Sequence, residues 1–169
     1  KYINEPFEVS FKREKVTVGS VPYFGLLENN IGYVKLRSFT RNCSNDLKNA
    51  ILKLKEQSAT SLILDLRGNP GGLLNESVKI ANFFVNQGED IVSTKGKIKS
   101  WEQVYTATNK PIDTEIPLVV LIDQSSASAS EIVSGSLQDL DRAVIVGKRS
   151  FGKGLVQQTR KLSYNSQLK

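Results

Sequence analysis

Three short apolar runs, each ending in a loop of small or polar residues, restrict the fold of this chain more than any other feature. They span residues 61–66 (SLILDL), 117–122 (PLVVLI) and 143–147 (AVIVG). Continuous apolar runs of this length are typical of buried strands in parallel sheets. Apolar residues recur at helical spacing in the segments 44–57, 75–86 and 129–140, which we predict to be helices. The alternation predicts an α/β domain in which helices cover a mixed sheet, with the three parallel strands adjacent or nearly so.

Weaker patterns predict the remaining elements. Alternating or short apolar stretches predict strands at 7–18, 31–36, 91–94 and 103–106, with another beginning at 155–158. Residues 19–30 contain several turn-forming residues and are predicted to be irregular. Ser44 is the expected N-cap of the first helix. Residues 162–169 are predicted to form a hairpin whose partner strand lies outside the sequence.

The sequence contains no histidine. A Ser–His–Asp or Cys–His catalytic group is therefore excluded within this chain, and the commonest metal ligand and general base is absent. Cys43 is the only cysteine, so neither an internal disulfide nor a cysteine-based zinc site can form. If the chain catalyses a reaction, a side chain other than histidine must move the protons.

Positive charge predominates, with a formal net charge of +6. Lysine and arginine cluster at 12–15, and lysine clusters at 95–99. Aromatic residues are not interleaved with these charges in a stacking pattern, so we interpret the clusters as solvated strands and loops rather than a nucleic-acid surface. No apolar run approaches the roughly 20 residues that a transmembrane helix requires, and no secretory signal is visible.

The loops that follow the three buried strands carry the residues of chemical interest. They span residues 67–72, 124–130 and 150–154. In open α/β sheets the working site lies outside the carboxyl ends of the strands. The three loops are therefore expected to converge on one crevice.

Each loop, taken alone, has a functional and a structural interpretation. A serine within 125–130 lies at a helix N-terminus, which suits either a nucleophile beside an oxyanion site or an ordinary N-cap. Gly71 and Gly72 suit either the close approach of a backbone amide to a ligand or a tight turn. Lys153 suits either a surface position or, because desolvation lowers the pKa of a lysine, the role of general base.

Four motifs occur together in one order and spacing, and they discriminate between these interpretations. They are DLRGNPGG (65–72), SSASASE (125–131), SLQD (136–139) and GKRSFGKGLVQ (147–157). From Ile31 onward the chain closely resembles the C-terminal processing proteases, also called tail-specific proteases. The resemblance implies a crotonase-like α/β fold. It also implies a serine endopeptidase that cleaves near the C-termini of protein substrates through an acyl-enzyme, without a metal or cofactor.

The family's Ser–Lys dyad matches two residues that lie 25 positions apart in this chain. The resemblance makes Ser128 the nucleophile and Lys153 the general base, with Gln157 orienting the lysine. Ser128, and neither Ser126 nor Ser130, is therefore expected at the strand-to-helix turn that faces the glycine pair. The lysine amine must come within about 2.6–3.2 Å of the serine hydroxyl. Whether the short glycine-flanked loop holds it there in this chain is left open.

The resemblance also assigns the groups that assist the dyad. The oxyanion hole is formed by the backbone amides of Gly72 and Ala129, with Gly71 as a further candidate. The amides of Gly72 and Ala129 are expected to point to the same side. Asp139 matches an aspartate of the family that we interpret as a support for the end of the helix.

The resemblance implies a domain organisation and a cellular setting as well. Residues 1–18 match the last strand and exit linker of a PDZ domain, 19–30 connect, and 31–169 form a protease core that we expect to be truncated at its C-terminus. The expected partners are polypeptides with accessible C-termini, and not nucleic acid. Membrane association through further segments and homo-oligomerisation are left open. The implied location is the bacterial periplasm or cell envelope.

Two other classes of function share the implied fold. A non-catalytic peptide-binding module would keep the fold without an assembled dyad. A crotonase-fold enzyme that acts on a thioester would use the oxyanion hole but would not need a Ser–Lys pair. Reaction with a serine-directed probe discriminates between the protease and the binding module.

Overall fold

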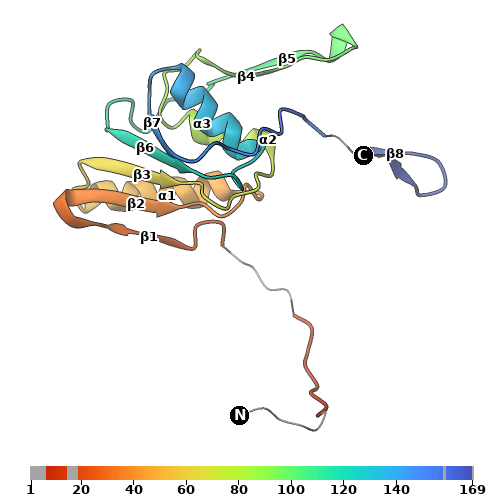
Figure 1. Cartoon of the computed structure of the whole chain (residues 1–169), viewed down its shortest axis with the longest axis horizontal. Coiled ribbons are helices and arrows are strands. Elements are labelled where there is room, and N and C mark those ends of the chain that lie inside the picture. Colours follow the sequence, from red (N-terminus) through yellow and green to blue (C-terminus); the bar gives the residue numbers. More distant parts are fainter. Residues whose placement is uncertain (1–6, 15–18, 158, 169) are drawn as a thin grey trace.

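The computed structural model describes residues 7–14, 19–157 and 159–168 (Figure 1). A five-stranded sheet with the order β1-β2-β3-β6-β7 lies at its centre. The first strand is antiparallel to the second, and the other four are parallel to one another. These strands are β1 (Tyr23–Leu26), β2 (Ile31–Lys35), β3 (Ser61–Asp65), β6 (Leu118–Ile122) and β7 (Val144–Gly147). The predicted mixed sheet, with its three adjacent parallel strands, is confirmed.

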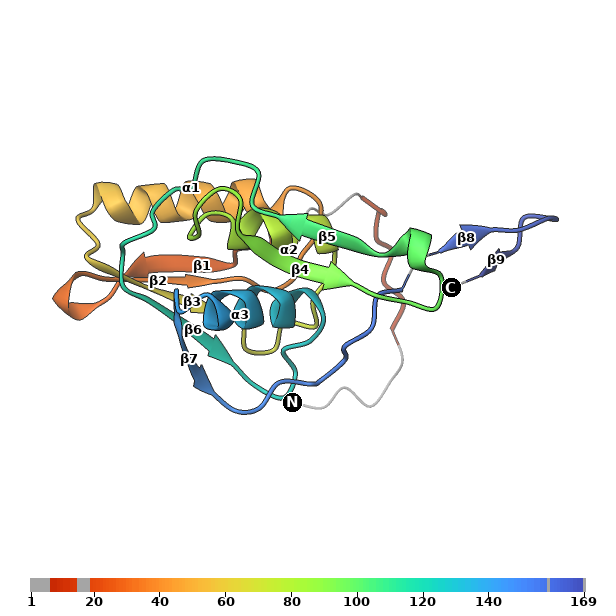
Figure 2. The same ribbon diagram turned by 90° about the horizontal axis from the view of Figure 1, so that it is seen from above.

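Helices and two separate hairpins complete the described part of the chain. The α-helices are α1 (Cys43–Glu56), α2 (Leu74–Ala81) and α3 (Ala129–Asp139), and short 3₁₀ turns lie at Glu28–Asn30 and Lys99–Trp101. The hairpins pair β4 (Asp90–Thr94) with β5 (Gln103–Thr106) and β8 (Arg160–Lys161) with β9 (Gln167–Leu168). Seen from above, the β4–β5 hairpin runs beside α2 and projects beyond the central sheet (Figure 2). None of the helices in the described residues is long and apolar enough to cross a bilayer.

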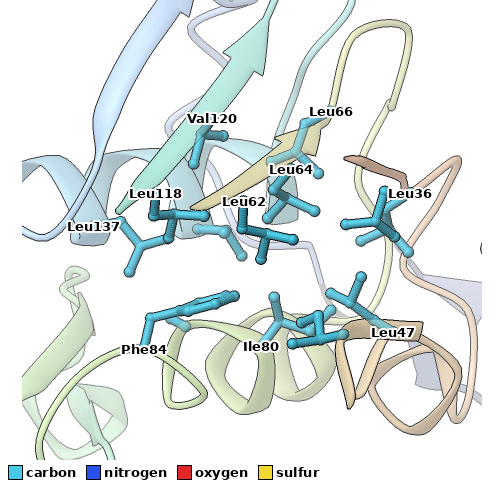
Figure 3. Packing of buried hydrophobic residues seen from close by; sticks show 14 of the residues in the cluster. Leu36, Leu47, Leu62, Leu64, Leu66, Ile80, Phe84, Leu118, Val120 and Leu137 are labelled. Atoms are coloured by element: carbon cyan, nitrogen blue, oxygen red, sulfur yellow. The ribbon is translucent and has the colours of Figure 1, made fainter. Parts of the chain in front are cut away.

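The helices cover one face of the central sheet, and the hydrophobic core lies between the helices and the sheet (Figure 3). Residues alternate along β3, so that Leu62 and Leu64 are buried in this core whereas Ile63 is only half-buried. The helices contribute Leu47 and Ile51 from α1, Ile80 from α2, and Val133 and Leu137 from α3. β2, β3 and β6 therefore bury one face each, whereas β7, at the edge of the sheet, has no buried residue, so the interpretation of residues 143–147 as a buried strand is wrong.

Leu64 provides a test of this core, because its side chain is completely buried in the middle of β3. Leu64→Ala is expected to lower the free energy of unfolding by about 2–5 kcal/mol, since it removes buried apolar surface and leaves a cavity. Leu52→Ala is the matched control, because Leu52 on α1 is 38% exposed. Urea denaturation should show a change of about 0.5 kcal/mol or less for the control. Equal losses in the two variants would contradict the assignment of the core.

Two predictions about strands at the start of the chain are wrong. Residues 7–14 form no strand, and residues 15–18 lie outside the described part. An alternating pattern requires a neighbouring strand for its backbone hydrogen bonds, and no strand of the described residues pairs with 7–14. Conversely, β1 lies within the segment predicted to be irregular, because antiparallel pairing with β2 holds it extended in spite of Gly25.

The helix boundaries also differ from the predictions. Asn42, in the left-handed region with φ 67°, is the N-cap of α1 in place of Ser44. Ser44 is buried in the first turn, and its amide donates a hydrogen bond to the Glu76 carboxylate (2.9 Å). α2 ends at Ala81 rather than at residue 86, because the Asn82 side chain exchanges two hydrogen bonds of 2.8 Å with the backbone of Asn109.

The last part of the chain follows the β7 strand away from the sheet (Figure 1). Residues 155–157 form no strand, although one was predicted to begin there, and residue 158 lies outside the described part. The predicted C-terminal hairpin is present as β8 and β9, whose strands pair with each other. Residue 169 also lies outside the described part.

Candidate active site

The loops that follow β3, β6 and β7 lie at one edge of the sheet, because these strands are adjacent and parallel. A cleft of about 970 Å³ is lined by residues from all three loops, together with α3 and β4. The residues of the predicted site that line it are Gly72, Ser128, Asp139, Lys153 and Gln157. The fold therefore brings residues from segments far apart in the sequence into a single cleft.

Ser128 is the N-cap of α3 and has an unusual backbone conformation, with φ 56° and ψ −112°. Such a conformation is costly for a residue other than glycine, and strained residues of this kind cluster at functional sites. The neighbouring Ser126 and Ser130 are fully buried, and their hydroxyls donate to the backbone carbonyls of Leu66 (2.8 Å) and Asn69 (2.9 Å). Of these three serines, only Ser128 lines the cleft.

The glycine loop packs directly against the turn that carries Ser128. A Cβ atom on Gly71, which has φ 96°, would lie 2.5 Å from the Ala127 carbonyl oxygen and 2.9 Å from the Ala129 amide nitrogen. The Gly71 amide itself donates to the Asn69 side-chain oxygen (2.9 Å), so it is not free to bind an oxyanion. The described part of the chain offers no hydrogen-bond acceptor to the backbone amides of Gly72 and Ala129. Gly72 and Ala129 are therefore better oxyanion donors than Gly71.

Asn69 joins the glycine loop to the turn that carries Ser128, a role that the sequence analysis missed. Its buried side chain donates to the Leu36 carbonyl (2.9 Å) and accepts from the Gly71 amide. Its own carbonyl accepts from the Ala127 amide (3.1 Å) and from the Ser130 hydroxyl (2.9 Å). Asn69 thus fixes the separation between the two loops that would form an oxyanion hole.

A buried carboxylate anchors the start of the glycine loop. Asp65 is 1% exposed. Its carboxylate accepts three hydrogen bonds of 2.8–3.0 Å from Arg67 and one from the Tyr33 hydroxyl (2.5 Å), and it forms an ion pair with Lys35 (3.3 Å). Burial alone would raise the pKa of Asp65. The hydrogen bonds from Arg67 and Tyr33, with the charge of Lys35, outweigh burial and hold that pKa well below its usual range.

Replacement of this carboxylate should destabilise the domain in a pH-dependent manner. Asp65→Asn is expected to cost about 2–3 kcal/mol at pH 7, because hydrogen bonds to a charged acceptor are lost. A carboxylate with a lowered folded-state pKa stabilises the fold above its unfolded pKa of about 4, and the contribution is lost as the pH falls through the folded value. Urea titrations should therefore show a difference between parent and variant that shrinks below about pH 4. Asp141→Asn, at an exposed position, is the control and should show no such trend.

The loop that carries Lys153 is attached to the turn that carries Ser128 and to the first turn of α3. The Phe151 amide donates to the Ser126 carbonyl (3.0 Å), and the Lys153 amide donates to the Glu131 carboxylate (3.1 Å). Lys153 is half-buried and lines the cleft, but no hydrogen bond joins its amine to the Ser128 hydroxyl within the described residues. The two residues therefore share the cleft without the direct contact that was left open above.

Glu131, in the first turn of α3, is the second residue that the sequence analysis missed. Its carboxylate accepts hydrogen bonds from the Ser128 amide (2.7 Å), the Ser150 hydroxyl (2.8 Å), the Gly152 amide (2.6 Å) and the Lys153 amide (3.1 Å). Burial alone would raise the pKa of Glu131, but these hydrogen bonds together lower it. The capping-box spacing of a serine and a glutamate three residues apart was visible in the sequence.

The two remaining predicted residues, Gln157 and Asp139, lie further from Ser128. Gln157 lines the cleft as an exposed residue beyond the Lys153 loop. Asp139 is exposed at the far end of α3, about 16 Å along the helix axis from Ser128. This distance excludes direct contact between Asp139 and the nucleophile. Among the described residues, no group of three or more His, Cys, Asp or Glu could hold a metal ion.

Comparison with known proteins identifies the class to which this fold and cleft belong. The sequence model of the family described as "Peptidase family S41" matches residues 30–169, and the chain belongs to this family. Two proteins called "Probable CtpA-like serine protease", from Staphylococcus aureus (strain N315) and Staphylococcus epidermidis (strain ATCC 12228 / FDA PCI 1200), are 38% and 39% identical to it over 167 and 164 residues. These alignments cover 98% and 96% of the chain, which spans about a third (33%) of each relative.

Solved structures show the same relationship. The photosystem II D1 C-terminal processing protease is 34% identical, with a TM-score of 0.77 over 92% of this chain and 43% of that protein. The tricorn protease, at 18% identity and a TM-score of 0.53, shares the fold over 82% of the chain. The mixed α/β architecture is thus that of S41 protease structures.

Proposed function

We propose that the protein containing this chain is a serine endopeptidase in which Ser128 is the nucleophile and Lys153 the general base. The position of Ser128 carries the proposal. It occupies a strained turn at the N-terminus of α3, against the glycine loop and in the same cleft as Lys153. A hydroxyl at such a place lies beside the positive end of a helix dipole and beside backbone amides that can bind an oxyanion.

The proposed mechanism is acyl transfer. The neutral Lys153 amine removes the Ser128 proton as the serine oxygen attacks the peptide carbonyl, and the amides of Gly72 and Ala129 bind the tetrahedral oxyanion. Lys153 then protonates the leaving amine as the C–N bond breaks. Water, deprotonated by Lys153, hydrolyses the acyl-enzyme and regenerates the serine. Gln157 orients the lysine in this scheme, and Asp139 supports the end of the helix.

Direct contact within the dyad requires a movement of the Lys153 side chain toward Ser128. The lysine amine must reach about 2.6–3.2 Å from the serine hydroxyl, and such catalytic hydrogen bonds often tighten only when substrate binds. Lys153 is flanked by Gly152 and Gly154, both at positive φ and with open space around them. Because nothing crowds this part of the loop, the Lys153 side chain can change rotamer toward Ser128 while the loop amides stay bonded to Glu131.

We infer that the substrate is a polypeptide cleaved near its C-terminus. The inference follows from the family and from a structural relative that is called a C-terminal processing protease. On the same grounds we propose a crotonase-like fold, a remnant of a PDZ domain with its exit linker at residues 1–18, a connecting segment at 19–30 and a core at 31–169. We also propose a setting in the bacterial periplasm or cell envelope.

Labelling with a fluorophosphonate tests the function. The intact protein is expected to react covalently at Ser128 and to cleave an unstructured protein, and Ser128→Ala should abolish both activities. Ser125→Ala is the matched control, because Ser125 is exposed in the same motif and does not line the cleft. Peptide mapping identifies the labelled serine.

The other outcomes of this experiment distinguish the alternative functions. Binding of peptides without labelling or cleavage would indicate a non-catalytic module on the same fold. Hydrolysis of a thioester that persists in Ser128→Ala would indicate a crotonase-type enzyme that uses only the oxyanion hole. Either result would replace the protease proposal.

A further inference from the structure

The Glu131 carboxylate lies where two loops of the cleft meet. One of its oxygens, Oε2, accepts from the amides of Ser128 and Lys153, and the other, Oε1, accepts from the Ser150 hydroxyl and the Gly152 amide. Both residues of the proposed dyad are thus bonded through their backbones to the same oxygen atom. No base mechanism requires this connection, and an ordinary capping box would use only the first of the four bonds.

Two properties suit this carboxylate to the task of holding the loops together. An ionised carboxylate is purely an acceptor with about four lone-pair sites, which is the number that the four donors require. Hydrogen bonds to an ionised acceptor are also roughly twice as strong as neutral ones. These bonds matter most for residues 150–154, because the glycines on both sides of Lys153 leave the backbone of this loop free to adopt several conformations.

We propose that Glu131 is a positioning residue that sets the location of the general base relative to the nucleophile, by binding the backbone of the Lys153 loop and the backbone of Ser128 to one carboxylate. The proposal rests on the proposed function and deepens it. Glu131 transfers no proton and binds no substrate in this role. Its effect on catalysis is exerted entirely through the place at which it holds Lys153.

Glu131→Gln tests this role with almost no change in side-chain volume. The amide of glutamine keeps one acceptor oxygen and turns the other into a donor, which would then face either the amides of Ser128 and Lys153 or the Gly152 amide and the Ser150 hydroxyl. In the first orientation two amides lose their acceptor, and in the second the Gly152 amide loses it while the Ser150 hydroxyl can turn to accept. The Phe151–Ser126 backbone bond remains and keeps the loop attached, so the expected change is a local release of Lys153 toward solvent.

The expected result concerns the rate of Ser128 acylation by a fluorophosphonate in the intact protein, measured from pH 6 to pH 10. At pH 7 the Glu131→Gln variant should react about ten- to a hundredfold more slowly, which is part of the 10²–10⁴-fold that a general base contributes. The pH of half-maximal acylation should also move, because the lysine that accepts the serine proton is then released from its place beside Ser128. The other charged residues of the cleft, Asp90, Lys95 and Asp139, are unchanged in the variant.

Two further variants separate positioning from general stability. Glu76→Gln is the matched control. Glu76 is a buried carboxylate that accepts a hydrogen bond from a backbone amide in the first turn of another helix, α1, and it does not line the cleft. It should leave the pH profile unchanged even if it lowers the melting temperature. Ser150→Ala removes one of the four donors and should give a smaller shift of the profile in the same direction. Ser150→Ala also tests whether Glu131 positions Lys153 if the Glu131→Gln variant does not fold.

Three outcomes overturn part of the argument, and they differ from one another. A parent protein that does not acylate at Ser128 would end the proposed function itself. Normal acylation by the parent and by Glu131→Gln, with the same pH profile, would end the positioning role and leave the function intact. A slower variant with an unshifted profile would mean that Glu131 only stabilises the fold.

Discussion

Lys153→Ala is expected to slow the acylation of Ser128 by about 10²–10⁴-fold at neutral pH, the contribution typical of a general base. The amine must be neutral to accept the serine proton, so the rate in the parent should rise with pH. The variant has no such group and should lose this rise. Stopped-flow or gel-based labelling with a fluorophosphonate, in the intact protein, measures both effects.

Lys148→Ala is the matched control for this substitution. Lys148 is an exposed lysine at the end of β7, in the same connection, and it does not line the cleft. Its removal changes the net charge by the same amount and should leave the acylation rate within about twofold, as is usual for surface substitutions. If Lys153→Ala reacted as fast as the parent, the lysine would be a surface residue and another base would have to be sought.

Gly71→Ala is expected to have the second large effect, on both activity and stability. The new methyl group would lie 2.5 Å from the Ala127 carbonyl oxygen and 2.9 Å from the Ser128 Cβ atom. Positive φ adds strain to this clash, and the total cost to the free energy of unfolding is expected to be about 2–5 kcal/mol. If the protein folds, the nucleophile turn must move, and a displacement of about 1 Å costs on the order of 10²-fold in rate.

Gly68→Ala separates the clash from the strain. Gly68 lies in the same loop with φ 71°, but a Cβ atom there would meet nothing within 4 Å. This control should lose stability through backbone strain alone, about 1 kcal/mol, and should keep near-normal acylation. Chemical denaturation and fluorophosphonate labelling of both variants provide the comparison. Equal loss of acylation in the two would show that the packing of Gly71 against the nucleophile turn does not matter for catalysis.

The parts of the fold that were predictable are those in which local pattern and tertiary role agree. The apolar runs at 61–66, 117–122 and 143–147 became adjacent parallel strands, and the loops after them met in one cleft. The topology places these loops together whatever their detailed conformation. This is why a serine and a lysine 25 residues apart could be assigned to one cleft from their motifs.

The parts that were not predictable depend on partners distant in sequence. Antiparallel pairing with β2 makes a strand of a segment that contains Gly25, and bonds to Asn109 end α2 early. The choice between Gly71 and Gly72 as a free amide depends on which of them the Asn69 side chain binds. Glu131 was visible as half of a capping box, but the three donors from the Lys153 loop become apparent only in three dimensions.

The β4–β5 hairpin has a consequence for how substrate choice and chemistry are divided within this fold. Asp90, Ile91, Val92 and Ser93 of β4 line the same cleft as Ser128, yet the two strands of the hairpin pair only with each other among the described strands. Residues 95–102 at the tip can therefore change in length or charge without altering the register of the central sheet or the geometry of the nucleophile turn. Exchange of this hairpin between members of the family should transfer preference for a polypeptide while the rate of the chemical step stays with the recipient.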